Sequence, residues 1–223
     1  MKKILYIYIV LYSSFCFSQN IFLTEAKEIH ANSDKFLYAL KEEPKTDAQY
    51  LGKIEVSGFS NDDAAVFSEI YKKAKSIGGN SYFMKPAENI EGNSTFNPHH
   101  YILYIYYKEK QTIPQKENTV YLINPEKEIE VRINNKKIKL PQRSFLQLDL
   151  SQQEITDISV GKFLGSRIKL QAKNNQPEQY FQISGKKISA NSPASPGINY
   201  KTGDIIALEK SFAEFLLTIY EKI

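Results

Sequence analysis

One segment of the chain specifies its own conformation more completely than any other. From about Asp62 to Ile77, apolar residues recur at three-to-four spacing and would share one side of a helix. They are Ala64, Phe67, Ile70, Tyr71, Ala74 and Ile77. Ser60 or Asn61 can cap its start, where Asp62-Asp63 suits the positive end of the helix dipole. Gly78-Gly79 is a typical helix end. The pattern therefore predicts an amphipathic helix packed on a sheet.

Strand-like segments flank this helix. Tyr50–Ser57 precedes it, and Asn80–Pro86 and His100–Lys108 follow. The last segment is rich in Tyr and Ile at both odd and even positions, which would point to opposite faces of a strand. This predicts a central strand buried on both faces. Residues 20–40 show modest helical character, with Ile29, Phe36, Leu37 and Leu40 on one side. Together these patterns predict a small β-α-β-β domain over residues 20–110.

This part of the chain resembles small bacterial domains of the YbjQ and RcsF type. The resemblance rests on the strand Tyr50-Leu51-Gly52-Lys53-Ile54-Glu55-Val56 and on the helix end Lys73-Ala74-Lys75-Ser76-Ile77-Gly78-Gly79-Asn80. It covers about residues 48–108, with Gly79 where the family usually has Ala. It implies a small α+β domain, some members of which work in the periplasm. Metal binding described for the family is not carried over, because no matching cysteine cluster is present.

After a charged segment containing Pro114, with residues 111–118 as the linker, the pattern changes to short strands. The predicted strands are Thr119–Ile123, Ile129–Ile133, Lys137–Leu140, Phe145–Leu150, Thr156–Val160, Arg167–Ala172 and Gln179–Ser184. Asn134-Asn135 suits a tight hairpin because Asn tolerates positive φ. This spacing predicts an antiparallel, β-sandwich-like domain over residues 119–188. The segment also resembles small β-sandwich modules of bacterial envelope lipoproteins.

The C-terminal part is predicted as a flexible connector, residues 189–203, followed by a helix over residues 204–223. The apolar face of that helix contains Ile205, Leu208, Phe212, Phe215 and Ile219. Such a face must be buried. It would either bind a partner, including a second copy of the chain, or dock on the chain's own sheet. The second alternative is favoured, because apolar helix faces mostly belong to the core of their own domain.

The N-terminus has the organisation of a secretory signal peptide. Met1-Lys2-Lys3 is followed by the apolar segment Ile4–Phe17 and then by Ser18-Gln19. This ending resembles signal peptides common in Bacteroidetes-type bacteria and predicts cleavage after Gln19. An uncleaved anchor is the alternative, but the apolar segment is shorter than the roughly 20 residues that span a bilayer. A bulky Phe15 before Cys16 fits lipoprotein processing poorly.

Removal of residues 1–19 would leave a chain without cysteine, since Cys16 is the only one. Disulfides, a thiolate nucleophile and cysteine-based zinc sites are thereby excluded from the mature chain. Loss of Lys2 and Lys3 lowers the formal net charge from +4 to +2. This near-balance gives no electrostatic case for nucleic acid as a partner.

The histidines and serines do not form a known catalytic motif. His99 and His100 would point to opposite faces of a strand, and His30 lies far away in the sequence, so a metal site is not predicted. Ser57-Gly58 and Ser184-Gly185 lie at strand ends, without a Gly-x-Ser-x-Gly elbow. Because triads can assemble from distant residues, a hydrolase stays an open alternative.

The remaining charged and glycine motifs have structural interpretations. Asp62-Asp63 caps a helix, Glu42-Glu43 lies in a loop, and Gly78-Gly79 follows a helix, where it cannot hold a phosphate on helix N–H groups. The clusters Lys136-Lys137 with Lys139, and Lys186-Lys187, are typical of solvated hairpins, with a polyanionic partner as the alternative.

The sequence as a whole predicts an α+β chain without cofactor or metal and without a transmembrane segment after the leader. We expect an exported, non-catalytic protein of the periplasm, outer membrane or exterior, which acts by binding or structural support. The alternatives are a small secreted hydrolase and an envelope-stress sensor component, the latter implied by the RcsF resemblance.

Overall fold

The computed structural model of the chain describes residues 19–87, 96–109, 116–162, 164–185, 187–190 and 198–223. The predicted leader, except for Gln19, lies outside these residues. The chain divides into two compact units, Met1–Ile113 and Pro114–Ile223. The boundary falls inside the segment predicted as a linker. Helices and several sheets are both present, which confirms the α+β class.

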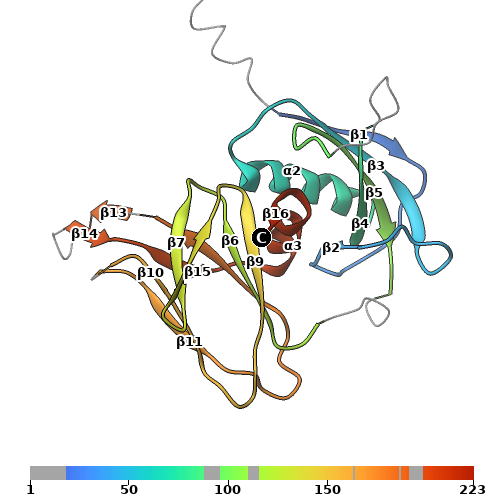
Figure 1. Cartoon of the computed structure of the whole chain (residues 1–223). Helices are drawn as coiled ribbons and strands as arrows, with labels where there is room; N and C mark the ends of the chain where they lie inside the picture. The colour runs from blue at the N-terminus through green and yellow to red at the C-terminus, as the bar shows by residue number, and fades with distance from the viewer. Residues whose placement is uncertain (1–18, 88–95, 110–115, 163, 186, 191–197) are drawn as a thin grey trace, which may run out of the picture. The chain divides into compact units, whose positions relative to one another are not determined.

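Unit 1 is a five-stranded sheet with one helix on it (Figure 1). The strands follow the order β1-β3-β5-β4-β2 across the sheet. Their bounds are β1 Asn20–Ala26, β2 Tyr38–Ala39, β3 Gln49–Ser57, β4 Ser81–Pro86 and β5 His100–Tyr107, and the helix is α2, Asp63–Ser76. The predicted succession of strand, helix, strand and strand is therefore found as β3, α2, β4 and β5.

Helix α2 forms as its periodicity predicts and buries Val66, Phe67, Ile70 and Ala74. Its N-cap is Asp62, whose Oδ1 accepts the Ala65 N–H at 2.9 Å. The predicted caps were Ser60 or Asn61. Ser60 instead supports the turn before the helix, since its Oγ accepts the Asp62 N–H at 3.0 Å. The carboxylate of Asp62 thus does the capping as well as complementing the dipole.

Three residues on which the family resemblance rests, Gly52, Gly78 and Asn80, allow close packing or join strands in unit 1. A Cβ on Gly52 would lie 2.1 Å from the Glu25 carbonyl oxygen of β1, and one on Gly78 would lie 1.7 Å from the His30 carbonyl oxygen. Gly78 also has φ +82°, where a side chain is strained. Asn80 joins the start of β4 to the end of β5: its Nδ2 donates to the Lys108 carbonyl, and its Oδ1 accepts the Lys108 N–H.

The prediction of helical character for residues 20–40 is wrong. The segment contains β1, then an extended run, then β2. In β1, half-buried Ile21 and Leu23 alternate with exposed Phe22 and Thr24. This alternation is typical of a strand with one face in water. The helix prediction rested instead on the apolar residues that follow, from Ile29 to Leu40.

Strand β5 lies at the centre of the sheet, as predicted, but it is not buried on both faces. Tyr101, Leu103 and Ile105 are buried on the face that carries α2. On the opposite face Tyr106 is buried, but His100, Ile102 and Tyr104 are only half-buried. Large tyrosine side chains allow this intermediate state, because a ring can be covered while its hydroxyl stays in water.

Unit 2 contains two larger sheets with the orders β11-β10-β7-β8 and β15-β12-β6-β9-β16, and a two-stranded pair of β13 (Lys187–Ala190) and β14 (Ile198–Lys201) (Figure 1). The strands of the larger sheets are β6 Thr119–Asn124, β7 Ile129–Ile133, β8 Lys136–Leu140, β9 Ser144–Asp149, β10 Thr156–Val160, β11 Arg167–Leu170, β12 Gln179–Ser184, β15 Asp204–Ala207 and β16 Glu221–Lys222. Asn134 and Asn135 both have positive φ and form the predicted hairpin between β7 and β8. The prediction of an antiparallel domain is wrong in part: β12 pairs in parallel with β6, and β16 with β9.

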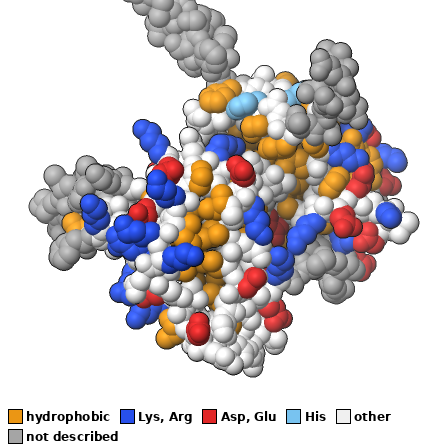
Figure 2. Space-filling view, viewed as in Figure 1, with side chains coloured by type: hydrophobic (Ala, Val, Ile, Leu, Met, Phe, Trp, Pro, Cys, Tyr) orange, Lys and Arg blue, Asp and Glu red, His pale blue; other side chains and the backbone are white. Residues whose placement is uncertain are grey.

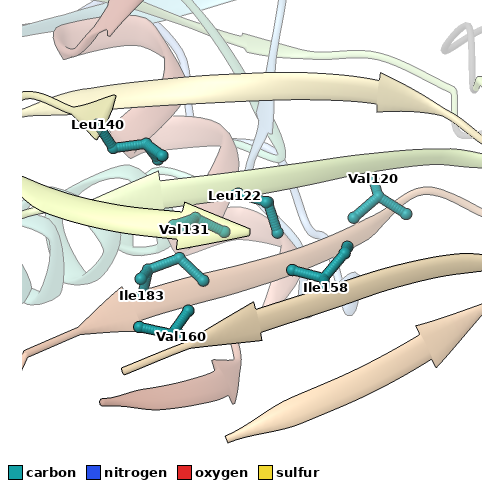
Figure 3. Packing of buried hydrophobic residues seen from close by; sticks show 7 residues of the cluster. All are labelled: Val120, Leu122, Val131, Leu140, Ile158, Val160 and Ile183. Carbon is teal, nitrogen blue, oxygen red and sulfur yellow. The ribbon is translucent and has the colours of Figure 1, made fainter. Parts of the chain in front are cut away.

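The core of unit 2 lies between its two larger sheets. Figure 3 shows Val120, Leu122, Val131, Leu140, Ile158, Val160 and Ile183 facing one another. Strand β6 is buried along its whole length. It contributes Val120 and Leu122 to this core, whereas Tyr121 stacks on Tyr180 of β12 at 5.2 Å between ring centroids. A strand covered on both faces lies at the middle of a layered domain.

The predicted C-terminal elements differ from those found. The predicted connector, residues 189–203, overlaps a hairpin of β13 (Lys187–Ala190) and β14 (Ile198–Lys201); residues 191–197 lie outside the described part. Residues 204–223 are not one helix. They form β15, then helix α3 (Lys210–Ile219), then β16. Ile205 and Ile206 are β-branched and pair with β12, and Glu209 caps α3 by accepting the Phe212 N–H.

Neither helix among the described residues has the length and hydropathy needed to cross a membrane.

Candidate functional site

The apolar face predicted to bind a partner belongs to the core of unit 2. Phe215 is 0% exposed and Ile219 is 7% exposed. Phe212 is half-buried. Ile205 and Leu208 are not on the helix: Ile205 lies in β15 and packs against the sheet core, and Leu208 follows that strand. The helix face is therefore docked on the chain's own strands, which was the favoured alternative.

A polar cluster fixes α3 on its sheet. The Lys210 Nζ lies 3.5 Å from a carboxylate oxygen of both Glu178 and Glu214. The Tyr180 hydroxyl donates to Glu178 at 2.8 Å. Burial, and then the charges of Glu214 and Glu178, raise the pKa of Tyr180 well above its ordinary value. Tyr180 is therefore a neutral donor at physiological pH. The cluster holds α3 on the chain's own sheet, which is the alternative that the sequence analysis favours.

The three histidines do not come together. The His30 ring stacks on Tyr107 with 3.7 Å between ring centroids. His99 is exposed and its ring lies 5.0 Å from that of Phe59. His100 Nε2 lies 2.9 Å from Glu55 Oε1. Within the described residues, no group of three or more His, Cys, Asp or Glu side chains is arranged to hold a metal ion.

The structure does bring one of the two strand-end serines near a histidine and a carboxylate. Ser57 of β3 is the cross-strand partner of His100 in β5, and His100 pairs with Glu55. These are the residue types of a hydrolytic triad. However, the side chains of His100 and Glu55 are 45% and 38% exposed on an open sheet face. Activation of a serine needs a water-excluded site with oxyanion donors, so this arrangement suits a surface ion pair.

The face of the unit 1 sheet opposite α2 is named the open face. The strand register places its side chains in rows: Phe22, Glu55, Ile102 and Lys85 in one, and Glu25, Lys53, Tyr104 and Phe83 in the next. The Lys85 and Lys53 ammonium groups lie 4.7 and 5.7 Å from the centre of the Tyr104 ring. Lys53 also pairs with Glu25 in the same row, and Lys85 pairs with Glu43. The charges on this face are therefore largely neutralised by neighbouring side chains of unit 1.

The electrostatics of the open face follow from these pairs. The ammonium of Lys53, 2.9 Å away, holds the pKa of Glu25 below its ordinary value. Burial, and then the charge of Glu43, raise the pKa of Tyr106 to about 12. Glu25 is thus ionised and Tyr106 is neutral near pH 7.

Exposed aromatic side chains gather at one end of the unit 1 sheet. Phe59 is 49% exposed and Phe96 is 40% exposed. Their two loops are adjacent, because the Gly58 N–H donates to the His99 carbonyl at 2.9 Å. We name Phe59, Phe96 and His99 the aromatic end. Figure 2 shows histidine side chains beside apolar ones at this end of unit 1. Phe22, 56% exposed, lies nearby on β1, opposite Glu55.

Sequence analysis missed the aromatic end because both phenylalanines lie outside the regular elements. The signal was nevertheless present. Phe59 sits in the Gly58–Asn61 turn, and Phe96 sits in a polar loop, where neither residue serves a periodic apolar face. A large apolar residue in a turn has no core to join by pattern alone, so its exposure could have been anticipated.

A shallow cavity of about 450 Å³ lies in unit 1. It is lined by Thr46, Asp47, Ala48, Gln49, Tyr107 and Glu109. Asp47 is already paired with the Lys108 ammonium, which lowers the pKa of the Asp47 carboxyl. The Asp47 carboxylate of this cavity is therefore engaged within the protein.

The lysine clusters fit their structural interpretation where they are described. Lys137 pairs with Glu130 at 3.2 Å, and Lys139 pairs with Glu128 at 3.2 Å. Lys186 lies outside the described residues. Figure 2 shows acidic and basic side chains interspersed on the visible surface.

Comparison with profiles of known protein families, with curated proteins and with solved structures finds no match.

Proposed function

We propose that this chain is an exported, non-catalytic protein of the cell envelope that acts by binding a partner through the aromatic end of unit 1. The leader-like N-terminus supports export. The observation that carries the binding role is the exposure of Phe59 and Phe96 on adjacent loops, next to His99. Exposed apolar groups that cluster mark interaction surfaces more often than scattered ones do.

The other candidate binding elements are already occupied. Helix α3 is docked on its own sheet, with Phe215 completely buried. The charged side chains of the open face pair with one another or, in the case of Lys85, with Glu43. The aromatic end differs, because its phenylalanine rings are large apolar groups left in water. Aromatic side chains are enriched at the centres of protein interfaces, where their burial contributes most of the binding free energy.

Mass spectrometry of the mature chain and capture of its partner would test both parts of the proposal. We expect a chain beginning at Asn20 in the envelope or external fraction of the producing bacterium. With a photo-cross-linking residue in place of Phe59, we expect a discrete adduct from an envelope extract. The double variant Phe59→Ser/Phe96→Ser should reduce capture by roughly tenfold or more, as expected for the loss of two interface anchors.

Ile155→Ser is the control, because Ile155 is an apolar side chain that is 56% exposed and lies in unit 2. It should capture the partner as the wild type does. Equal capture by the double variant would contradict the binding role of the aromatic end. Covalent labelling of Ser57 by a fluorophosphonate probe would contradict the non-catalytic part and favour the hydrolase.

A further inference from the structure

Strand β1 begins at the residue that directly follows the predicted cleavage bond. Asn20 is the cross-strand partner of Ser57, and Ile21 and Phe22 pair with Val56 and Glu55. The Gln19–Asn20 bond is thus separated from the folded sheet by no spacer. The first residues of the mature chain are part of the unit 1 sheet itself.

A processing protease needs these same residues in an unpaired state. Extended peptides are commonly recognised through main-chain hydrogen bonds to a strand edge, and cleavage of a folded protein requires local opening. Hydrolysis adds water across the bond and leaves a carboxylate on Gln19 and an amine on Asn20. We infer that the leader is removed before β1 pairs with β3, so that β1 is added to a sheet that has otherwise formed. This inference rests on the proposed export.

The position of β1 in the sheet makes this order possible. It is an edge strand whose neighbour is β3, while β3, β5 and β4 pair with one another without it. A central strand would have delayed the whole sheet until cleavage. Because β1 lies at the edge, β3, β5 and β4 can pair while residues 20–26 remain available to the protease.

Gly52 provides a specific way to displace β1. A Cβ at this position would lie 2.1 Å from the Glu25 carbonyl oxygen and 3.2 Å from the Ala26 Cα, both in β1. Gly52→Val should therefore push the Glu25–Ala26 end of β1 off the sheet and weaken its pairing with β3. Gly185→Ala is the matched glycine control, because a Cβ there would meet nothing within 4 Å.

The test uses the full-length precursor in detergent with a purified bacterial signal peptidase. We expect cleavage between Gln19 and Asn20 to be at least about tenfold slower for the folded precursor than for the same chain freshly diluted from urea. A six-residue Gly/Ser spacer inserted after Asn20 should restore rapid cleavage of the folded precursor. Gly52→Val should also accelerate it, and Gly185→Ala should not.

Two results would overturn the inference, and they differ in what else they affect. Equal cleavage rates for folded and unfolded precursor, with or without the spacer, would show that β1 does not protect the bond and would leave the proposed export intact. Failure to cleave this bond in either state would remove both the inference and the predicted processing on which the proposed export relies.

Discussion

The two units of this chain differ in how the faces of their central sheets are covered. In unit 1, α2 covers one face of the sheet, and the other face remains half-exposed at Ile102 and Tyr104. In unit 2, the five-stranded sheet is covered by the four-stranded sheet on one side and by α3 on the other, so that β6 is buried throughout. Unit 1, which has fewer layers, therefore leaves one face of its sheet partly in water.

The largest expected effect concerns the helix that completes unit 2. Phe215→Ala should cost about 3–5 kcal/mol, because the side chain is fully buried and its removal leaves a cavity. Hydrogen exchange followed by mass spectrometry should show loss of protection in β6 and β12 while unit 1 stays protected. Ile206→Ala is the control, since Ile206 is 39% exposed. Unchanged protection in β6 would contradict the assignment of α3 to the core.

The corresponding weak point of unit 1 is the end of α2. Gly78→Ala places a side chain at φ +82° and against the His30 carbonyl, so we expect a cost of roughly 2 kcal/mol or more. The loss should appear as a lower urea midpoint for unit 1 alone. A stability equal to that of Gly185→Ala would show that the 30–34 segment can move away from the helix without cost.

Removal of either helix cap should lower the free energy of unfolding by a smaller amount, and the two losses should differ. Asp62→Ala removes a preferred capping carboxylate and should cost about 1 kcal/mol. Glu209→Ala removes a longer and less favourable cap from α3 and should cost less. Thermal unfolding of the two variants would sharpen the comparison. A greater loss for Glu209→Ala would mean that α3 depends more on its cap than on its burial.

The smallest expected effect is a pH dependence of the open face. The pKa of Glu25 is held below its ordinary value of 4.5 by Lys53. The pair therefore stabilises the folded state above pH 4.5 and loses this effect as the pH falls through the folded pKa. Urea unfolding of the wild type and Glu25→Gln should differ at pH 7 and converge in acid. A difference that stays constant as the pH falls through the folded pKa of Glu25 would exclude the ion pair as its cause.

Sequence patterns predicted the elements that carry a clear periodicity and a clear end. The 62–77 helix has both, and so has the Asn134-Asn135 hairpin, because two positive φ angles suit asparagine. The leader, the resemblance and the function stay predictions. The errors concern residues whose environment is set by distant strands. Ile205 fits a helix by spacing, but β12 supplies a strand partner that no local pattern shows.

The candidate binding surface was least accessible to sequence analysis. Phe59 and Phe96 are far apart in the chain, and the contact between their loops depends on the antiparallel pairing of β3 with β5. Local patterns show which residues a regular element buries, but they do not show which loops the sheet brings together. The burial of Phe215, in contrast, could be predicted from the sequence, because the apolar spacing around it already required a covering surface.

The parallel pairing of β12 with β6 has a consequence for how the chain is made. Val120 meets Gln179, and the sheet gains β15 and β16 only from the last residues to be synthesised. Unit 1, by contrast, has all its strands once Tyr107 has left the ribosome. A product terminated prematurely before residue 204 should therefore contain a folded first half and an unfinished second half, whose uncovered β6 would promote aggregation.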